Sequence, residues 1–474
     1  MKIKAIALAL LFGITLVPSA SAEQEYLLRL EREDRLSRVL TDRNLTLVRS
    51  IDWIMLHVVT GPPNMAPDAL ETWVRSHNDV LTFQRDFTAT MGEVAAHPDL
   101  RETTQTLEDA LVVDRTPMAF YGAQAWKGFA LQPALSKIDV PAARSTGNIA
   151  EGIIVAVVDS GVDFDHPLLS GALVDQGWDF TRNQAGATDW GDLDQSTAAI
   201  LDTDDCPWIQ GDTGPVLDPD CLPGNLNQST AAILDGLTIG QLDGHTIPPA
   251  FGHGTMVAGL IRAVAPGARI LPVKAFNADG TGRSYDIAQA IYYAVTRGAK
   301  IINMSFTFTQ RSDEVMYATA WAAQQGAVLV GSAGNRGEIR RAWPAEHKWV
   351  LSVGSTNLLD VRSPFSNHGY DVFKIGAPGE KLVTLYPGGR YASVSGTSFS
   401  SALVSGALAL MKKSRNRLEW GASDDVMKFG SFAEIANVSR DASNRYPKRI
   451  KAPLAVQITP VYERNKVKAI NSIQ

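Results

Sequence analysis

The sequence is poor in three things: cysteine, positive charge and long apolar runs. Its 474 residues include only two cysteines, which allow at most one disulfide bond within the chain. Lysine and arginine number 44 against 50 aspartate and glutamate residues, a net charge of −6, so a basic groove for nucleic acid is not expected. After the N-terminal segment, no stretch approaches the ~20 apolar residues of a membrane-spanning helix.

What is present is enough apolar material for a large core. Hydrophobic residues make up 45% of the chain, which excludes disorder along its whole length. The length exceeds that of one average domain, so we expect a large domain together with a smaller one.

The first 22 residues have the pattern of a secretory signal peptide. A basic start at residues 1–4 precedes an apolar segment at 5–17, and Ala20-Ser21-Ala22 is typical of a cleavage site. We therefore expect a secreted protein, extracellular or periplasmic, with no stable membrane anchor. In either compartment Cys206 and Cys221 are expected to form a disulfide bond, two free thiols being the alternative.

Residues 23–92 predict a small α+β module. Strand-like alternation covers residues 26–30, 45–59 and 80–88, and helical spacing covers 33–43 and 66–74. The segment 93–129 that follows begins with a polar, charged stretch, which predicts a linker and processing region.

Residues 130–420 predict the large domain, of the α/β class. Apolar, β-branched runs alternate with helical patterns, which indicates a doubly wound parallel sheet flanked by helices. The expected strands are 152–158, 267–276, 300–306 and 327–331, with helices at 285–296 and 313–325. The functional site of such a sheet lies beyond the carboxyl ends of its strands, where Asp159, Ser305 and Asn335 fall. Residues 421–474 form a C-terminal extension.

Residues 183–250 interrupt this domain with eleven aspartates and neither lysine nor arginine. The segment 191–202 recurs in nearly the same form as 224–235, with the two cysteines between the copies. We interpret this region as a surface insertion. Its aspartates predict either a solvated acidic loop or a structural Ca²⁺ site, since Ca²⁺ takes several carboxylate oxygens. The aspartates concerned are Asp202, Asp204, Asp205, Asp218 and Asp220.

The run 395–406 places Ser398 between small residues, just before an apolar, alanine-rich segment. This pattern predicts a serine in the first turn of a buried helix, where unpaired N–H groups and the helix dipole favour a developing negative charge. Taken alone, the motif is more typical of a structural helix than of a nucleophile.

A histidine and an aspartate change that interpretation. Glycines flank His253 on both sides, and Asp159 follows a predicted strand. Asp159, His253 and Ser398 stand in one of the three chain orders known for the acyl-transfer triad. With Asn335, they resemble the motifs of the subtilisin-like serine proteases, the subtilase family, over residues 130–410. The motifs that carry the resemblance are 157–163, 252–259, 332–335 and 396–398.

The resemblance implies a role for each of these residues. Ser398 Oγ is expected to attack the peptide carbonyl, His253 to take its proton, and Asp159 to orient the imidazole. Asn335 and the Ser398 N–H are expected to stabilise the oxyanion. Substrate is expected to bind as an extended strand. The residues expected to contact it are Ser305, Phe306, Thr307, Ser332, Ala333 and Gly334.

The resemblance also implies partners. Substrates would be proteins or peptides, and catalysis would require no cofactor. The module 23–92 would be a prosegment that assists folding and acts as an intramolecular inhibitor until it is cut off, at a position anywhere from residue 88 to 131. Two alternatives are a peptide-processing transpeptidase and a non-catalytic peptide-binding relative.

Several positions depart from the family pattern. Phe399, Ala402 and Leu403 stand where the family usually has methionine, proline and histidine. Thr307 and Phe308 stand where it usually has glycines that leave room for the substrate. The family's specificity therefore does not transfer directly to this chain.

Overall fold

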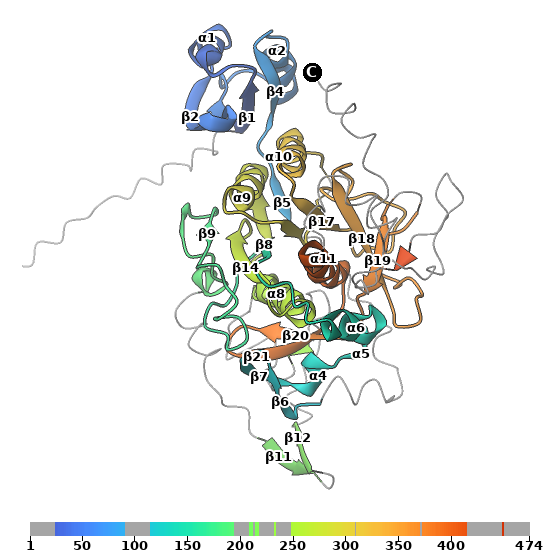
Figure 1. Ribbon diagram of the computed structural model, residues 1–474. Coiled ribbons are helices and arrows are strands. Elements are labelled where there is room, and N and C mark those ends of the chain that lie inside the picture. The colour runs from blue at the N-terminus through green and yellow to red at the C-terminus, as the bar shows by residue number, and fades with distance from the viewer. Residues whose placement is uncertain are drawn as a thin grey trace, which may run out of the picture. The chain divides into compact units, whose positions relative to one another are not determined.

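The computed structural model describes residues 24–90, 114–193, 208–211, 214–217, 232–233, 248–308, 310–369, 372–414 and 448–449. The chain divides into two compact units, Met1–Asp86 and Phe87–Gln474 (Figure 1). The predicted signal peptide, both cysteines and the five aspartates of the expected calcium site lie outside the described residues. Among the helices that are described, none is long and apolar enough to cross a bilayer.

The N-terminal unit is a four-stranded antiparallel sheet with two helices, in the strand order β2-β3-β1-β4. Alternate residues of its first strand, Tyr26, Leu28 and Leu30, pack with Val39 and Val74 of the two helices. The elements are β1 (Glu25–Leu30), η1 (Glu33–Arg35), α1 (Leu36–Asp42), β2 (Thr46–Ile51), η2 (Asp52–Ile54), β3 (Leu56–Thr60), α2 (Pro67–Arg75) and β4 (Val80–Arg85).

The single strand expected at residues 45–59 is wrong, because two strands occupy this segment. The chain turns through η2 and Met55, whose φ of 54° is left-handed, and β3 then returns antiparallel to β2. The turn contains none of the glycine, proline or asparagine residues that usually mark one. Its residues Trp53, Ile54 and Met55 are apolar and therefore appeared to continue the strand.

A nine-stranded, mainly parallel sheet forms the centre of the C-terminal unit, which confirms the predicted fold class. The order is β10-β9-β14-β8-β16-β17-β18-β19-β22, and only the β10–β9 pair is antiparallel. The strands are β8 (Ile154–Asp159), β9 (Trp178–Asp179), β10 (Gln184–Ala185), β14 (Arg269–Lys274), β16 (Ile301–Met304), β17 (Val328–Ser332), β18 (Val350–Thr356), β19 (Ile375–Pro378) and β22 (Lys448–Arg449).

Helices cover both faces of this sheet (Figure 1). α9 (Ser284–Thr296) and α10 (Asp313–Gln324) lie on one face, and α8 (His253–Val264) and α11 (Thr397–Ser414) lie on the other. α8 is buried along its whole length, and small residues permit its close contact with α11. A Cβ on Gly406 of α11 would lie 2.6 Å from Val264 Cβ.

Shorter elements surround the sheet and its helices. β15 (Thr281–Arg283) pairs with β5 (Thr88–Thr90), β6 (Pro117–Phe120) with β7 (Ala123–Trp126), and β11 (Trp208–Gly211) with β12 (Gly214–Leu217). β20 (Leu382–Tyr386), β21 (Arg390–Val394) and β13 (Ala232–Ile233) form a small sheet. The remaining short helices are α4 (Lys127–Ala130), α5 (Pro133–Lys137), α6 (Val140–Ser145) and η4 (Trp190–Asp192).

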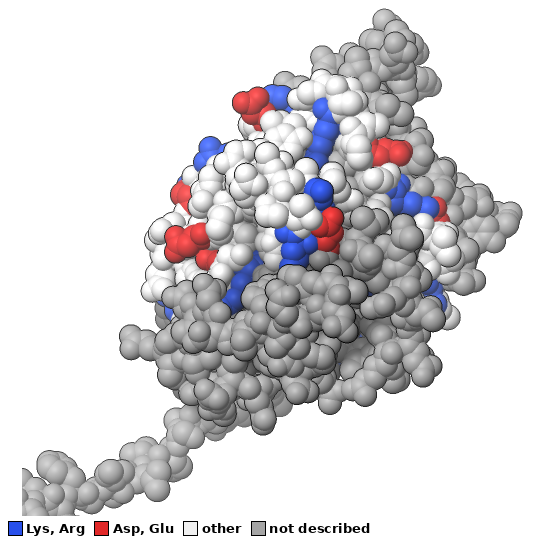
Figure 2. Space-filling model, turned by 90° about the horizontal axis from the view of Figure 1, so that it is seen from below, with Lys and Arg blue, Asp and Glu red and all other residues white. Residues whose placement is uncertain are grey.

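Charges of both signs are interspersed on the face shown in Figure 2. On its described part, lysine and arginine atoms lie close to those of aspartate and glutamate. The described part of this face therefore presents neighbouring opposite charges, whose fields largely cancel at a distance.

Candidate active site

His253 and Asp159 are hydrogen-bonded at the carboxyl end of β8. Asp159 is the last residue of that strand and is 1% exposed. Its Oδ1 accepts a hydrogen bond from His253 Nδ1 at 2.7 Å and another from the Ser160 N–H at 2.8 Å. A carboxylate only accepts, so Nδ1 carries the proton and the Nε2 of the neutral ring is left as an acceptor.

Close packing requires the glycines on either side of His253. Gly252 has a φ of 79°, and a Cβ on it would lie 2.7 Å from Pro387 Cδ. A Cβ on Gly254 would lie 1.9 Å from the carbonyl oxygen of Gly161, in the loop after β8. The glycines thus let the start of α8 approach that loop, which places the imidazole beside its carboxylate partner.

Ser398 lies in the first turn of α11, as predicted. Its Oγ donates to the Ser305 carbonyl at 2.9 Å rather than to His253. The Ser305 Oγ in turn donates to the Ser398 carbonyl at 2.9 Å and lies 2.8 Å from Ser401 Oγ. Ser305 therefore holds both the side chain and the backbone of Ser398. Among the described residues, the Ser398 N–H has no acceptor.

The Asn335 side chain, 7% exposed, is oriented by Thr397. Its Oδ1 accepts hydrogen bonds from the N–H and the Oγ1 of Thr397, each at 2.8 Å. The Asn335 Nδ2 donates to no described residue, so both of its hydrogens are available to a ligand. Asn335 and the first turn of α11 are thereby brought together, although 62 residues separate them in sequence.

The two segments expected to contact substrate lie side by side. Ser332 Oγ donates to the carbonyl of Phe306 at 3.3 Å, and a Cβ on Gly334 would lie 3.7 Å from Thr307 Cγ2. The Phe306 ring is 1% exposed and packs on Phe276 at 4.6 Å. Its side chain is therefore part of the core, and its carbonyl is held by Ser332.

A segment of the chain itself lies along β15 as an added antiparallel strand. In β5, Ala89 pairs with Gly282, and the Phe87 carbonyl accepts a hydrogen bond from the Ser284 N–H at 3.0 Å. The Phe87 ring lies 5.8 Å from that of Phe308, edge to face. Phe308, which stands where the family usually has a glycine, thus forms an aromatic contact surface for this segment.

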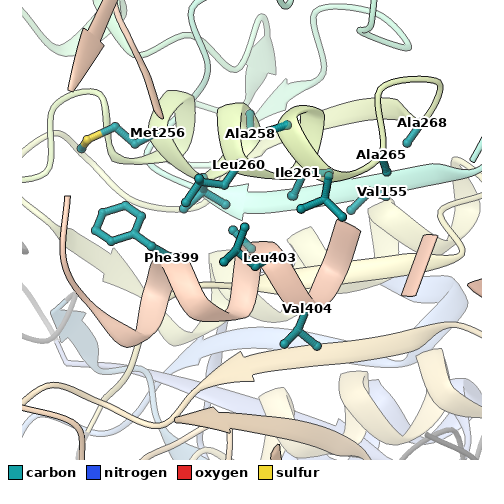
Figure 3. Packing of buried hydrophobic residues seen from close by; sticks show 14 of the residues in the cluster. Val155, Met256, Ala258, Leu260, Ile261, Ala265, Ala268, Phe399, Leu403 and Val404 are labelled. Carbon is teal, nitrogen blue, oxygen red and sulfur yellow. The ribbon is translucent and has the colours of Figure 1, made fainter. Parts of the chain in front are cut away.

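The positions near Ser398 that depart from the family pattern are buried between α11 and α8. Phe399, Ala402 and Leu403 are each 0% exposed, and Figure 3 shows Phe399 and Leu403 pointing toward α8. The Phe399 ring lies 5.6 Å from the imidazole of His253. Phe399 therefore packs beside the imidazole, and Ala402 and Leu403 are buried in the same helix.

Asp189 is a further carboxylate at the site, and no sequence motif indicated it. It is 1% exposed and accepts hydrogen bonds from Ser160 Oγ at 3.0 Å and from Thr255 Oγ1. Ser160 follows Asp159, and Thr255 lies in the first turn of α8. Burial raises the pKa of Asp189 to about 6, although the two hydroxyl groups and the charge of Lys274 act in the opposite direction.

The first residues of the acidic segment 183–250 belong to the site rather than to a surface insertion. The Nζ of Lys274, which is 0% exposed, donates to Asp192 Oδ2 at 2.7 Å and to the Phe276 carbonyl at 2.7 Å. It also donates to the Ser160 carbonyl. The surface interpretation is therefore wrong for Asp189 and Asp192, because a buried lysine requires a buried partner.

Comparison with known proteins shows which family this site belongs to. Residues 150–429 match the Subtilase family. The chain is 31% identical to thermitase from Thermoactinomyces vulgaris over 287 residues, which cover 58% of this chain and 80% of that protein. It is also 31% identical over 281 residues to a thermophilic serine proteinase from Bacillus sp. (strain AK1), covering 57% of this chain. The match spans 55% of that relative, about half of its length.

A solved structure shares the fold. Fervidolysin from Fervidobacterium pennivorans superposes with a TM-score of 0.64 at 19% identity, covering 93% of this chain and 62% of that one. The family match itself covers more than half of the sequence and includes Asp159, His253, Asn335 and Ser398. The chain belongs to the subtilase family of serine proteases.

Proposed function

We propose that the protein is a secreted endopeptidase that hydrolyses peptide bonds through Asp159, His253 and Ser398. The observation that carries the proposal is the 2.7 Å hydrogen bond between His253 Nδ1 and Asp159 Oδ1. It lies next to the first turn of α11, where Ser398 is found and where Phe399 contacts the imidazole.

The first step requires the Ser398 hydroxyl to leave the Ser305 carbonyl and turn toward His253 Nε2. Nε2 then takes the hydroxyl proton as Oγ attacks the peptide carbonyl, and Asp159 stabilises the imidazolium that forms. Nε2 next gives the proton to the leaving amine, and an acyl group remains on Ser398. Water attacks this ester by the same steps and releases the acid.

The oxyanion of each tetrahedral intermediate would be held by two donors from different elements. One is Asn335 Nδ2, whose orientation Thr397 fixes through Oδ1. The other is the N–H of Ser398, at the N-terminus of α11, where the helix dipole favours negative charge. Because both donors are in place before reaction, little reorganisation is needed.

The N-terminal unit would be the inhibitory prosegment of a self-processing zymogen. Two observations support this role: the unit is compact by itself, and β5, which follows it, pairs with β15 as an extended substrate would. The cut would fall after Thr90, on the carboxyl side of this bound strand. Export rests on the signal-peptide pattern of residues 1–22.

A fluorophosphonate probe tests the nucleophile directly. The purified protein is expected to become labelled, and the Ser398→Ala variant to remain unlabelled. Equal absence of label in both proteins would exclude an active serine nucleophile and would favour the peptide-binding alternative.

Product analysis separates hydrolysis from peptide ligation. Mass spectrometry of a digested peptide library is expected to show hydrolysed fragments whose new carboxyl termini share a sequence preference. Joined peptides as the main product would instead identify a transpeptidase.

A further inference from the structure

Three side chains of the N-terminal unit lie close together. Their residues are far in sequence from Asp159, His253 and Ser398. Glu33 belongs to η1, Asp52 to η2 and His57 to β3. One ligand atom from each, two carboxylate oxygens and an imidazole nitrogen, lie within 4.8 Å of one another. The two carboxylates repel each other, and a bound positive ion would relieve that repulsion.

His57 points an unpartnered nitrogen into this cluster. The residue is 0% exposed, and its Nε2 is buried without a hydrogen-bond partner among the described residues. Glu33 Oε2 is likewise buried without one. A polar atom left in this state costs free energy, which a bound ion would recover.

The distance between these two atoms matches two ligands of one ion. His57 Nε2 and Glu33 Oε2 are 3.4 Å apart, longer than the roughly 2.7–3.2 Å of an ordinary N–H···O hydrogen bond. Two ligands at about 2.0–2.2 Å from a tetrahedral ion are separated by roughly 3.3–3.6 Å. The pair is therefore already spaced for coordination.

The other buried histidine of this unit, His77, differs from His57 in the hydrogen bonds of its ring nitrogens. Its Nε2 lies 3.1 Å from Asp42 Oδ2, and its Nδ1 accepts from the Asp79 N–H at 3.2 Å. Both of its ring nitrogens are thus occupied by hydrogen bonds.

The opposite nitrogen of His57 has the partner that a metal ligand needs. Ser50 Oγ lies 2.7 Å from His57 Nδ1. When Nδ1 donates to this hydroxyl, the lone pair of Nε2 faces the carboxylates. Histidines that bind metal ions commonly donate their other ring N–H to a hydrogen-bond partner in this way.

We propose that Glu33, Asp52 and His57 bind a divalent transition-metal ion, with Zn²⁺ as the ion that best fits the ligand set. One imidazole and two carboxylates leave a fourth, water-filled position in a tetrahedral site. Ca²⁺ fits less well because it takes only oxygen ligands. Asp52 is exposed, so an ion can enter from solvent.

The ion would join three elements that the hydrogen bonds of the sheet do not join. η1 precedes α1, and η2 forms the turn between β2 and β3. Because the site exists only in the folded unit, metal binding adds to the stability of that unit.

Titration of the full chain with zinc chloride tests the proposal. The Ser398→Ala background keeps the N-terminal unit attached, and calorimetry counts the ions bound. One zinc equivalent is expected to disappear in His57→Gln. The affinity of this site for zinc is expected to fall on the order of tenfold to a hundredfold in Asp52→Asn.

His77→Gln is the matched control and is expected to keep the full stoichiometry. Far-ultraviolet circular dichroism checks that each variant folds. If His57→Gln does not fold, Asp52→Asn decides, because its side chain is exposed. The proposal is overturned if the parent binds no zinc or if folded His57→Gln or Asp52→Asn binds zinc as the parent does.

Discussion

Asp189 connects the loop that follows Asp159 with the first turn of α8, which begins at His253. It receives the hydroxyl of Ser160, whose N–H is bonded to Asp159, and the hydroxyl of Thr255, two residues after His253. Ser160 Oγ also accepts the Gly254 N–H at 3.2 Å. A single buried charge thus orients the ends of β8 and α8 toward each other.

That charge reduces stability at neutral pH. The pKa of Asp189 is raised by burial from 3.8 to about 6, so the folded state favours the protonated carboxyl. The contribution of the Asp189 carboxyl to the free energy of unfolding is fully present below about pH 4. It is lost as the pH rises through about 6, and the free energy of unfolding then falls by about 3 kcal/mol. Denaturant titrations test this with Asp189→Asn made in the Ser398→Ala background. In that variant the pH-dependent loss of unfolding free energy should be absent.

The same variant should lose activity when Ser398 is present. Without a charged acceptor for Ser160 and Thr255, kcat is expected to fall about tenfold with little change in KM. Asp165→Asn, which changes an exposed carboxylate, is the control and should alter neither property. An unchanged kcat in Asp189→Asn would show that its two hydrogen bonds do not position the site.

Sequence motifs singled out the residues that are proposed to react, and they missed Asp189, which is hydrogen-bonded to the neighbours of two of them. Asp159, His253, Asn335 and Ser398 each sit at a strand end or helix start that the pattern of residues revealed. Asp189 stands in an acidic run that reads as solvated surface, and only the fold shows that it is buried. Burial of a single charge depends on distant segments, so local sequence does not encode it.

At the scale of elements, β5 shows how an extended peptide lies on β15. The side chains of Phe87 and Ala89 face inward, with Ala89 2% exposed, whereas Thr88 between them is exposed. This alternation follows from the two-residue period of a strand. Phe308 therefore contacts Phe87, two positions before the buried Ala89.

This arrangement predicts an aromatic preference at the Phe87 position. A peptide of residues 84–90 should inhibit the purified protease competitively, and its Phe87→Ala form should inhibit about tenfold less well, since an aromatic pair and partial burial are both lost. The Thr88→Ala peptide is the control and should equal the parent. Equal inhibition by all three peptides would contradict the proposed contact between Phe87 and Phe308.

At the scale of the whole molecule, apolar runs predicted four strands of the large sheet, β8, β14, β16 and β17, because these strands are buried on both faces. They did not predict β18 and β19, which are equally buried. The turn at η2 escaped detection because its residues are apolar. The pairing of residues 88–90 with residues 281–283 also escaped, since no local pattern records a contact between segments so far apart. Long-range pairing is decided by the fold and by the order of events in folding.

The proposed self-processing makes the length of the purified protein depend on Ser398. Both the parent and Ser398→Ala should lose residues 1–22 on export, so the variant should begin at Glu23. The parent should begin after Thr90, because β5 lies on the acyl side of the bond to be cut. N-terminal sequencing and intact mass measure both ends. If Ser398→Ala is also shortened beyond Thr90 in the same host, another protease makes the cut and the self-processing zymogen is excluded.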